Sequence, residues 1–142
     1  MKITVRHASH QDDVRNYDTT KLRDHFLVPS IFEADDIVLT YSHIDRFVVG
    51  GAMPVSGPLK LESAKAIGSA NFLDRRELGA VNVGGPGRIT VDGAVFELAP
   101  RDCLYITMGS LDVRFESLDP ANPAKFYLNS APAHARFETM KI

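Results

Sequence analysis

Two short polar clusters interrupt the apolar stretches of this chain, and the first is "SHIDR" (42–46). If this segment is part of a strand, His43 and Asp45 lie on one face, where the carboxylate can orient the imidazole for proton transfer. Arg46 carries the fork of N–H groups that binds a carboxylate through two parallel hydrogen bonds. The alternative is a solvated hairpin end with a surface ion pair, which contributes little.

The second cluster is "DRRE" (74–77), where a strand would place Arg75 and Glu77 on one face and Arg76 on the other. The alternative here is an exposed strand start with cross-strand charge pairs. If the two clusters meet in the fold, they form a pocket for an anionic, hydroxyl-rich ligand. The catalytic candidates are therefore His43, Asp45 and Glu77, and the substrate-binding candidates are Arg46, Arg75 and Arg76.

Other kinds of site are less well supported. The loop "GGPG" (84–87) has no following Lys-Ser or Lys-Thr and lies between two expected strands, so it indicates a turn and not a phosphate-binding loop. The five histidines include no His-x-His pair, and we expect no metal site in this chain. Cys103 lies in an expected strand, which favours core packing over a reactive thiolate.

Alternation of apolar and polar residues sets the expected elements. Asp18 or Thr19 as an N-cap, Leu22 and Phe26 four residues apart, and Pro29 as a stop predict one or two helical turns within 17–29. No strand is followed by a long amphipathic helix, so the fold class is all-β, an antiparallel sandwich or barrel with a short N-terminal helix. The expected strands are 2–6, 36–42, 46–54, 59–63, 79–83, 88–92, 94–98, 103–107, 112–117 and 124–129.

Two glycine positions carry specific expectations. The pair Asp92-Gly93, between "ITV" and "AVF", predicts a two-residue hairpin turn with positive φ at both residues. The pair Gly50-Gly51 within an expected strand predicts a bulge or a tight bend.

Composition excludes several function classes. The chain has 142 residues, 44% hydrophobic and 24% charged, with a net charge of −2, so nothing favours binding to nucleic acid or to a membrane surface. No apolar signal segment opens the sequence, and the single cysteine excludes an internal disulfide. We therefore expect a cytoplasmic protein.

The stretch "ELGAVNVGGPGRITVDGAVFELAPRDCLYITMGS" (77–110) resembles the cupin superfamily in its order of glutamate, glycine turn and Asp-Gly hairpin. Glu77 falls where the first cupin motif has its glutamate, but the histidines of that motif are absent from "SANFLDRR" (69–76). The resemblance implies a cupin-like β-sandwich or barrel without a metal site of its own.

A closer resemblance is to the N-terminal half of the 5-keto-4-deoxyuronate isomerase family. It rests on the segments "LRDHFLV", "YSHIDRFVVGGAMP", "FLDRRELGAVNVGGPGRITVDG", "RDCLYITMG" and "PAKFYLNSAPAH". Members of this family resemble double cupins about twice this length and act in pectin breakdown.

This resemblance implies a ketol-isomerase that converts 4-deoxy-L-threo-5-hexosulose uronate to 3-deoxy-D-glycero-2,5-hexodiulosonate. It also implies a homo-oligomer with zinc in a second, C-terminal half. Within the half present here, we expect residues 1–30 to form a strand and short helix packed on the barrel, and residues 31–142 to form the barrel. The alternative is a metal-less cupin that binds a sugar acid, or mediates oligomerisation, without activity of its own.

Overall fold

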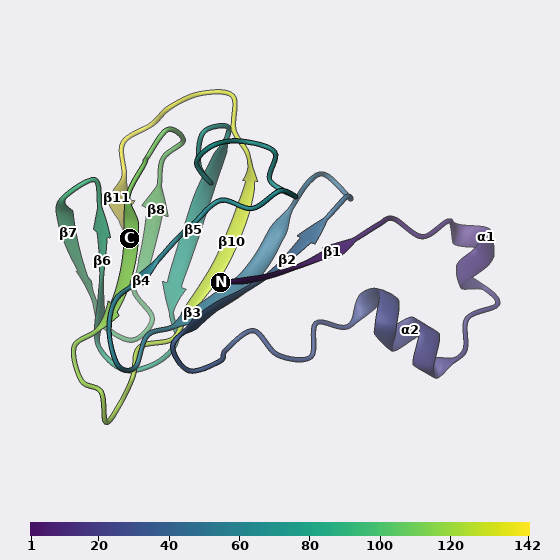
Figure 1. Ribbon diagram of the computed structural model, residues 1–142, viewed down its shortest axis with the longest axis horizontal. Coiled ribbons are helices and arrows are strands. Elements are labelled where there is room, and N and C mark those ends of the chain that lie inside the picture. The colour runs from purple at the N-terminus through teal and green to yellow at the C-terminus, as the bar shows by residue number, and fades with distance from the viewer.

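The computed structural model describes residues 1–142 as two β-sheets that face each other, with an arm, residues 7–30, that projects to one side (Figure 1). The helices are α1 (Gln11–Val14) and α2 (Thr19–Phe26). The strands are β1 (Lys2–Arg6), β2 (Asp36–Ser42), β3 (Val48–Met53), β4 (Leu59–Lys60), β5 (Arg76–Asn82), β6 (Gly87–Val91), β7 (Ala94–Leu98), β8 (Cys103–Ile106), β9 (Val113–Ser117), β10 (Phe126–Pro132) and β11 (Met140–Lys141).

The larger sheet has the order β1-β2-β3-β10-β5-β8-β11, and the smaller has the order β4-β9-β6-β7. All pairs of strands are antiparallel except β1 with β2, which are parallel. Alternate residues of each strand point between the sheets; on β5, for example, Leu78 and Ala80 are fully buried and Glu77 and Gly79 are not. The predicted all-β fold, a largely antiparallel sandwich with a short helix near the N-terminus, is confirmed.

The hairpin between β6 and β7 is the one predicted. Val91 pairs with Ala94, and the two residues between them have positive φ, 48° at Asp92 and 88° at Gly93. Asp92 also accepts hydrogen bonds from the backbone N–H groups of Leu111 and Asp112, at 2.9 and 2.8 Å. The turn is therefore fixed both by its own residue types and by the neighbouring loop.

The bulge or bend predicted at Gly50-Gly51 is wrong. Both glycines pair in regular register within β3, with β2 on one side and β10 on the other. A Cβ atom on Gly51 would lie 2.6 Å from the Ile31 carbonyl oxygen and 2.6 Å from the ring of Phe32. The absence of a side chain instead lets residues 31–32 cross closely over the sheet.

The predicted helix is present, with Asp18 as the N-cap: its carboxylate accepts from the Lys21 N–H at 2.8 Å. Its position differs from the expectation, because α1 and α2 lie beyond the end of β1 and do not pack on the barrel (Figure 1). Neither helix contributes a buried residue, so neither adds to the core. The boundary between residues 1–30 and 31–142 stays a prediction.

Sequence alternation missed two short elements, α1 and β11, which have only four and two residues. The predicted strand also began at residue 79, whereas β5 begins at Arg76.

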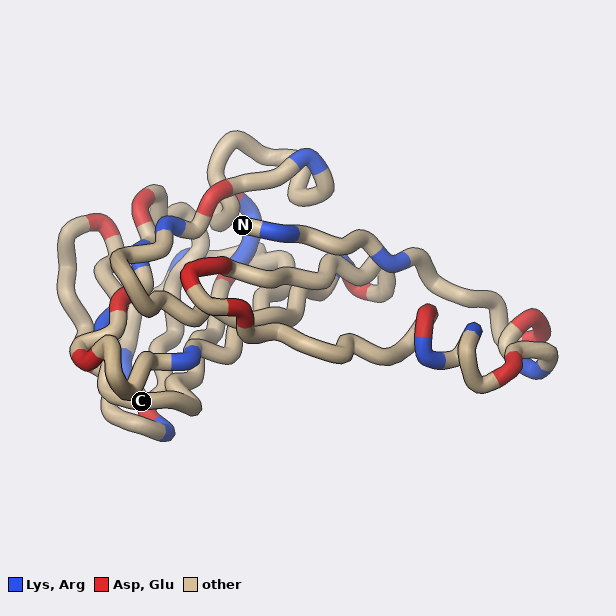
Figure 2. The backbone as a smooth tube through the Cα atoms, turned by 60° about the horizontal axis from the view of Figure 1, so that its bottom comes forward, with Lys and Arg blue, Asp and Glu red and all other residues tan.

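Neither α1 nor α2 has the length and apolar character of a membrane-spanning helix. Acidic and basic residues are spread over both the sandwich and the arm (Figure 2).

Candidate functional site

The three arginine candidates line one small cleft at the end of the sandwich. The cleft has a volume of about 120 Å³ and is lined by Tyr41, Arg46, Ile67, Gly68, Ser69, Arg75, Arg76 and Pro132. Arg46 comes from the turn between β2 and β3, Arg75 from the end of the 61–75 loop, and Arg76 from the first position of β5. The fold therefore brings together the arginines of "SHIDR" and "DRRE", which are some 30 residues apart.

Arg76 is the innermost of the three, with only 5% of its surface exposed. Its side chain lies on the same face of β5 as Leu78 and Ala80, at the edge of the core. Nε donates to Ser130 Oγ at 3.1 Å, and Nη2 donates to the carbonyl oxygens of Arg46 at 2.6 Å and Ser130 at 2.9 Å. The guanidinium carbon lies 5.7 Å from the centre of the Tyr41 ring, a cation–π contact.

Every hydrogen-bond partner of Arg76 is uncharged, and no carboxylate forms an ion pair with any of the three cleft arginines. A buried cation is ordinarily paired with an acid. Burial lowers the pKa of Arg76, nearby Tyr41 raises it, and the charge of Arg46 lowers it. The positive charge is therefore held here at a cost that an anion in the cleft would offset.

The Nη1 group of Arg76 is the one that can reach such an anion. Nη1 makes no hydrogen bond within the chain, because the three bonds of Arg76 use Nε and Nη2. Every side-chain nitrogen or oxygen that is sealed from solvent has a hydrogen-bond partner, so Nη1 is not among the sealed atoms. Nη1 is thus accessible to solvent, in a residue that lines the cleft. A carboxylate could bind to it and to the exposed arginines beside it.

Arg46 and Arg75 form the exposed rim of the cleft. Arg46 and the preceding Asp45 both have positive φ, 54° and 52°, as in a tight hairpin turn. This turn presents the Arg46 carbonyl to Arg76. Arg75 Nη2 lies 3.4 Å from the Gly68 carbonyl oxygen, a long hydrogen bond that leaves most of its donors free.

His43 and Asp45 do not share a strand face as expected, because residues 43–47 form the turn itself. The His43 ring stacks on His7 with ring centres 4.4 Å apart, and its edge meets Tyr41 at 5.1 Å. Its backbone N–H donates to the Arg6 carbonyl at 2.8 Å. Neither His43 nor Asp45 lines the arginine cleft, although Tyr41 touches both the cleft and His43.

Glu77 is separated from the cleft by the sheet. Glu77 alternates with the buried Arg76 and Leu78 along β5 and therefore faces outward. Arg75 precedes the strand, so the expected shared strand face of Arg75 and Glu77 is not observed. The Tyr105 hydroxyl donates to Glu77 Oε2 at 2.8 Å. Burial and this hydrogen bond raise the pKa of Tyr105.

The chain has no set of residues that fits a metal ion. Nowhere do three or more His, Cys, Asp or Glu side chains come together in a suitable arrangement. Glu77, at the position where the cupin motif has a metal ligand, has the Tyr105 hydroxyl as its partner. Cys103 is half-buried on β8, whereas a core position was predicted.

Sequence reasoning missed Tyr41 and Ser130, which hold Arg76 in place. Tyr41 lies within the predicted strand 36–42, and its position in the alternation of β2 is the only signal that it faces inward. Ser130 follows the predicted last residue of its strand, which extends to Pro132. Both are buried, at 6% and 2% exposure.

Comparison with curated proteins finds close relatives. The chain is 51% identical over 141 residues to a 4-deoxy-L-threo-5-hexosulose-uronate ketol-isomerase of Formosa agariphila, covering 99% of this chain and 50% of that protein. It is 51% identical over 142 residues to the protein of the same name from Yersinia pseudotuberculosis and 50% identical to that of Yersinia pestis, covering 51% of each. The chain thus spans about half the length of these relatives.

No family model matches the chain. Among solved structures, a cupin protein from Bacteroides fragilis is similar with a TM-score of 0.45 and 21% identity, over 63% of this chain and 68% of that one. A vicilin from tomato is similar with a TM-score of 0.41 and 15% identity, over 84% of this chain and 28% of that one.

Proposed function

We propose that this chain, which is 51% identical to 4-deoxy-L-threo-5-hexosulose-uronate ketol-isomerases, is the N-terminal half of such an isomerase. Its role in that enzyme is to bind the acid group of the substrate. The buried, acid-free guanidinium of Arg76 carries this assignment. The names of the relatives supply the substrate class, a six-carbon sugar acid with one carboxylate.

The cleft suits a carboxylate on physical grounds. A carboxylate can accept from Nη1 of Arg76 while the exposed Arg46 and Arg75 approach it from the rim. The low exposure of Arg76 strengthens this attraction, because little water competes for the guanidinium. A volume of about 120 Å³ accommodates an acid group and its neighbouring carbon, so the remainder of the sugar would extend out of the cleft.

Ketol isomerisation moves a proton between adjacent carbons and requires a base or an equivalent group. The proposed binding role does not place His43, Asp45 or Glu77 at the reacting carbons, since none of them lines the cleft. They stay candidates, His43 and Asp45 from the turn beside the cleft and Glu77 from the outer face. As the resemblance implies, we assign zinc to the second half of the longer protein, and we place the assembled enzyme in the cytoplasm as a homo-oligomer.

The alternative is a sugar-acid binding module without catalytic function. Both hypotheses use the same cleft, so the acid-free Arg76 supports them equally. They differ in whether the bound acid is positioned for a reaction that a second half completes. Turnover by the longer protein therefore distinguishes them, whereas binding to the present chain tests the cleft itself.

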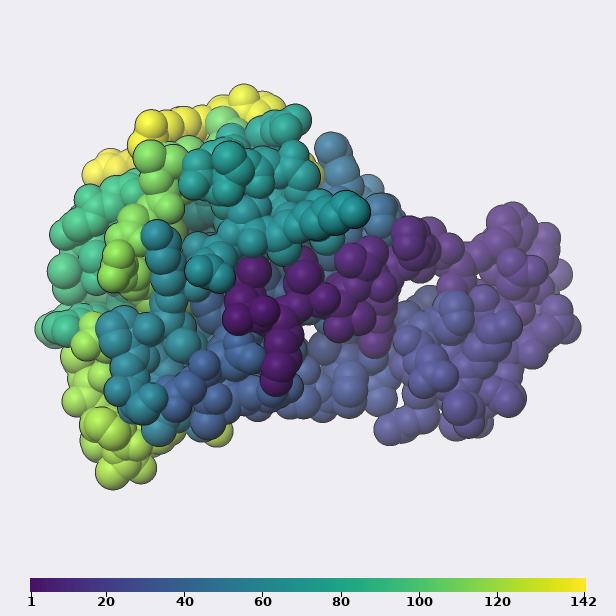
Figure 3. Space-filling model, in the orientation of Figure 1, coloured from purple at the N-terminus to yellow at the C-terminus, as the bar shows by residue number.

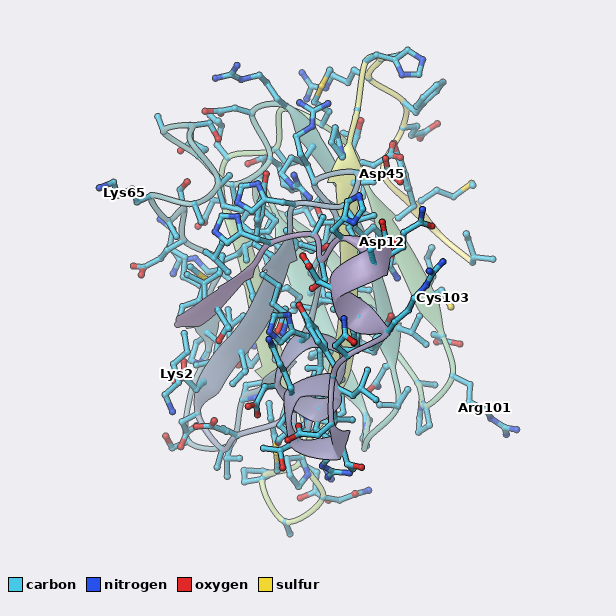
Figure 4. All side chains as sticks on the ribbon, turned by 90° about the vertical axis from the view of Figure 1, so that its right-hand side faces the viewer. Lys2, Asp12, Asp45, Lys65, Arg101 and Cys103 are labelled. Atoms are coloured by element: carbon cyan, nitrogen blue, oxygen red, sulfur yellow. The ribbon has the colours of Figure 1, made fainter.

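The binding test compares D-galacturonate with D-galactose, which has the same ring hydroxyls and no carboxylate. Calorimetric titration of the chain should show binding of the acid and no detectable binding of the neutral sugar. Arg75→Ala should weaken the affinity about 5- to 10-fold, the loss of about 1–1.4 kcal/mol expected for one partly exposed charge contact. Arg101→Ala is the matched control, because Arg101 is an exposed arginine that projects from another part of the surface (Figure 4).

Equal binding of both sugars, or equal losses in the two arginine variants, would refute the cleft assignment. With 4-deoxy-L-threo-5-hexosulose uronate itself, we expect binding to the present chain without turnover when proton NMR follows the substrate. Turnover by this chain alone would show that the reacting groups are within it, against the division of roles proposed here.

A further inference from the structure

The hydroxyl groups around the arginine cleft differ in whether the chain itself satisfies them. Ser69, which lines the cleft, donates from Oγ to a backbone carbonyl oxygen at 2.8 Å. Ser130, which holds Arg76 from below, accepts from its Nε and donates to another backbone carbonyl oxygen at 2.6 Å. Tyr41 also lines the cleft, but its Oη makes no hydrogen bond with any group of the chain. Tyr41 is therefore the cleft hydroxyl that is free to bind something else.

The side chain of Tyr41 is buried, although its hydroxyl is not sealed. Only 6% of the residue is exposed. Every side-chain oxygen that is sealed from solvent has a hydrogen-bond partner, so the unpartnered Oη must be accessible. A buried tyrosine usually has a partner for its hydroxyl within the protein. Here the partner is water or a ligand, and the cleft that Tyr41 lines is where it would lie.

The Tyr41 ring is held in position by two neighbouring side chains. The His43 ring packs against it with centres 5.1 Å apart and planes 79° apart, and the Arg76 guanidinium carbon lies 5.7 Å from its centre. Figure 3 shows the turn between β2 and β3 (blue) beside the 61–75 loop (teal), the two segments that border the cleft with β5. A donor that is fixed before the ligand arrives loses little conformational entropy on binding.

We propose that Tyr41 is a specificity-determining residue, whose hydroxyl recognises an oxygen atom on the carbon next to the bound carboxylate. The guanidinium of Arg76 takes the carboxylate, and Tyr41 Oη takes the second oxygen. The cleft of about 120 Å³ accommodates an acid group and its neighbouring carbon, so an oxygen on that carbon also lies within it. The preferred ligands are then 2-oxo and 2-hydroxy acids. The inference rests on the function proposed above, because it requires a carboxylate at Arg76.

The chemistry of the hydroxyl explains the preference. A tyrosine hydroxyl donates to a keto oxygen and can donate to or accept from an alcohol. A methylene group in the same place offers no partner and keeps water away from Oη, which leaves the hydroxyl unsatisfied. The substrate in the relatives' name, 4-deoxy-L-threo-5-hexosulose uronate, has its 5-keto oxygen on the carbon that bears the carboxylate. The sugar acid of the proposed function therefore carries the oxygen that Tyr41 would recognise.

The test compares small acids that differ only on that carbon, pyruvate with propionate and glycolate with acetate. The added oxygen withdraws electrons and makes the carboxylate a weaker acceptor, so it can strengthen binding only through a contact of its own. In NMR titrations of the chain, pyruvate and glycolate should each bind about fivefold more tightly than their partners, the value of one neutral hydrogen bond. Equal affinities within both pairs would overturn the role of Tyr41 and leave the carboxylate site standing. Failure of all four acids to bind would overturn both proposals.

Tyr41→Phe assigns the preference to the hydroxyl, because the phenyl ring can still face Arg76. In this variant the ratio of pyruvate to propionate affinity should fall from about five to about one. A merely structural role would lower both affinities together and preserve the ratio. Tyr127→Phe is the matched control: Tyr127 lies between the buried Phe126 and Leu128 on β10, so it faces away from the core, and the ratio should stay at its parent value. A ratio that survives Tyr41→Phe, or that falls equally in both variants, would refute the proposal.

Discussion

Arg76 allows a sharp test, because keeping its charge should cost more stability than removing it. Arg76→Lys retains a buried cation, but a single ammonium can reach only one of the three oxygens that the guanidinium now contacts. At about 1.5 kcal/mol for each of the two lost bonds, the free energy of unfolding falls by about 3 kcal/mol.

Arg76→Met loses all three bonds but also removes the cost of burying a cation that has no acid partner, which is several kcal/mol. The loss of the three hydrogen bonds and the removal of the burial cost are similar in size. The free energy of unfolding of Arg76→Met should therefore stay within about 1 kcal/mol of that of the parent chain. Methionine should therefore be more stable than lysine at this position by about 2 kcal/mol. Neither variant should bind D-galacturonate as tightly as the parent chain.

Urea denaturation followed by circular dichroism measures this order. For 142 residues, 2 kcal/mol corresponds to a difference of roughly 7 °C in Tm, so a thermal scan can check the same order. If methionine is as destabilising as lysine, the hydrogen bonds of Arg76 outweigh its desolvation, and the residue is chiefly structural. If both variants keep the affinity for the sugar acid, the carboxylate does not bind at Arg76.

Three further predictions concern the scaffold. Gly51→Ala should destabilise the chain by about 1–3 kcal/mol because the new methyl would clash with the segment that crosses over it, whereas Gly57→Ala, with open space, should change the urea midpoint little. Asn82→Ala removes two buried hydrogen bonds and one part-buried hydrogen bond to the 84–87 loop and β7, and it should cost about 3 kcal/mol in the same assay. Glu77→Gln should lower the pKa of Tyr105, seen as earlier ionisation in an ultraviolet pH titration; an unchanged titration would exclude the carboxylate as a cause of the raised value.

The two-sheet fold could be predicted because its signals are local. Alternation within five to seven residues identifies β2 and β7 at their observed bounds, and Asp92-Gly93 sets its own turn. The Gly50-Gly51 expectation failed for the opposite reason. The glycine at position 51 is required by the close approach of residues 31–32. These residues lie about 20 positions earlier in the sequence, so nothing within the strand sequence indicates the contact.

The cleft could be predicted only in part. The residue types of "SHIDR" and "DRRE" indicated an anion site, and the structure brings Arg46 and Arg76 together through a hydrogen bond. Which arginine faces inward depends on the phase of alternation in β5, which the buried Leu78 and Ala80 set and which the polar start "RE" does not indicate by itself. Likewise, Asp18 marks the start of α2, but nothing in the helix sequence states that it lies off the sandwich.

The phase of side-chain alternation in β5 also bears on which ligand this end of the sandwich favours. Side chains alternate between faces, so only one of Arg76 and Glu77 can point inward. If Glu77 faced inward, the cleft would offer a carboxylate to a metal ion; with Arg76 there, it offers a guanidinium beside two further arginines and repels a cation. The histidines that would accompany a metal-binding glutamate are absent from residues 69–76. Sequence and strand register therefore support the same proposal, since Arg76 lies in the cleft with Arg46 and Arg75 beside it, as the proposed anion site requires.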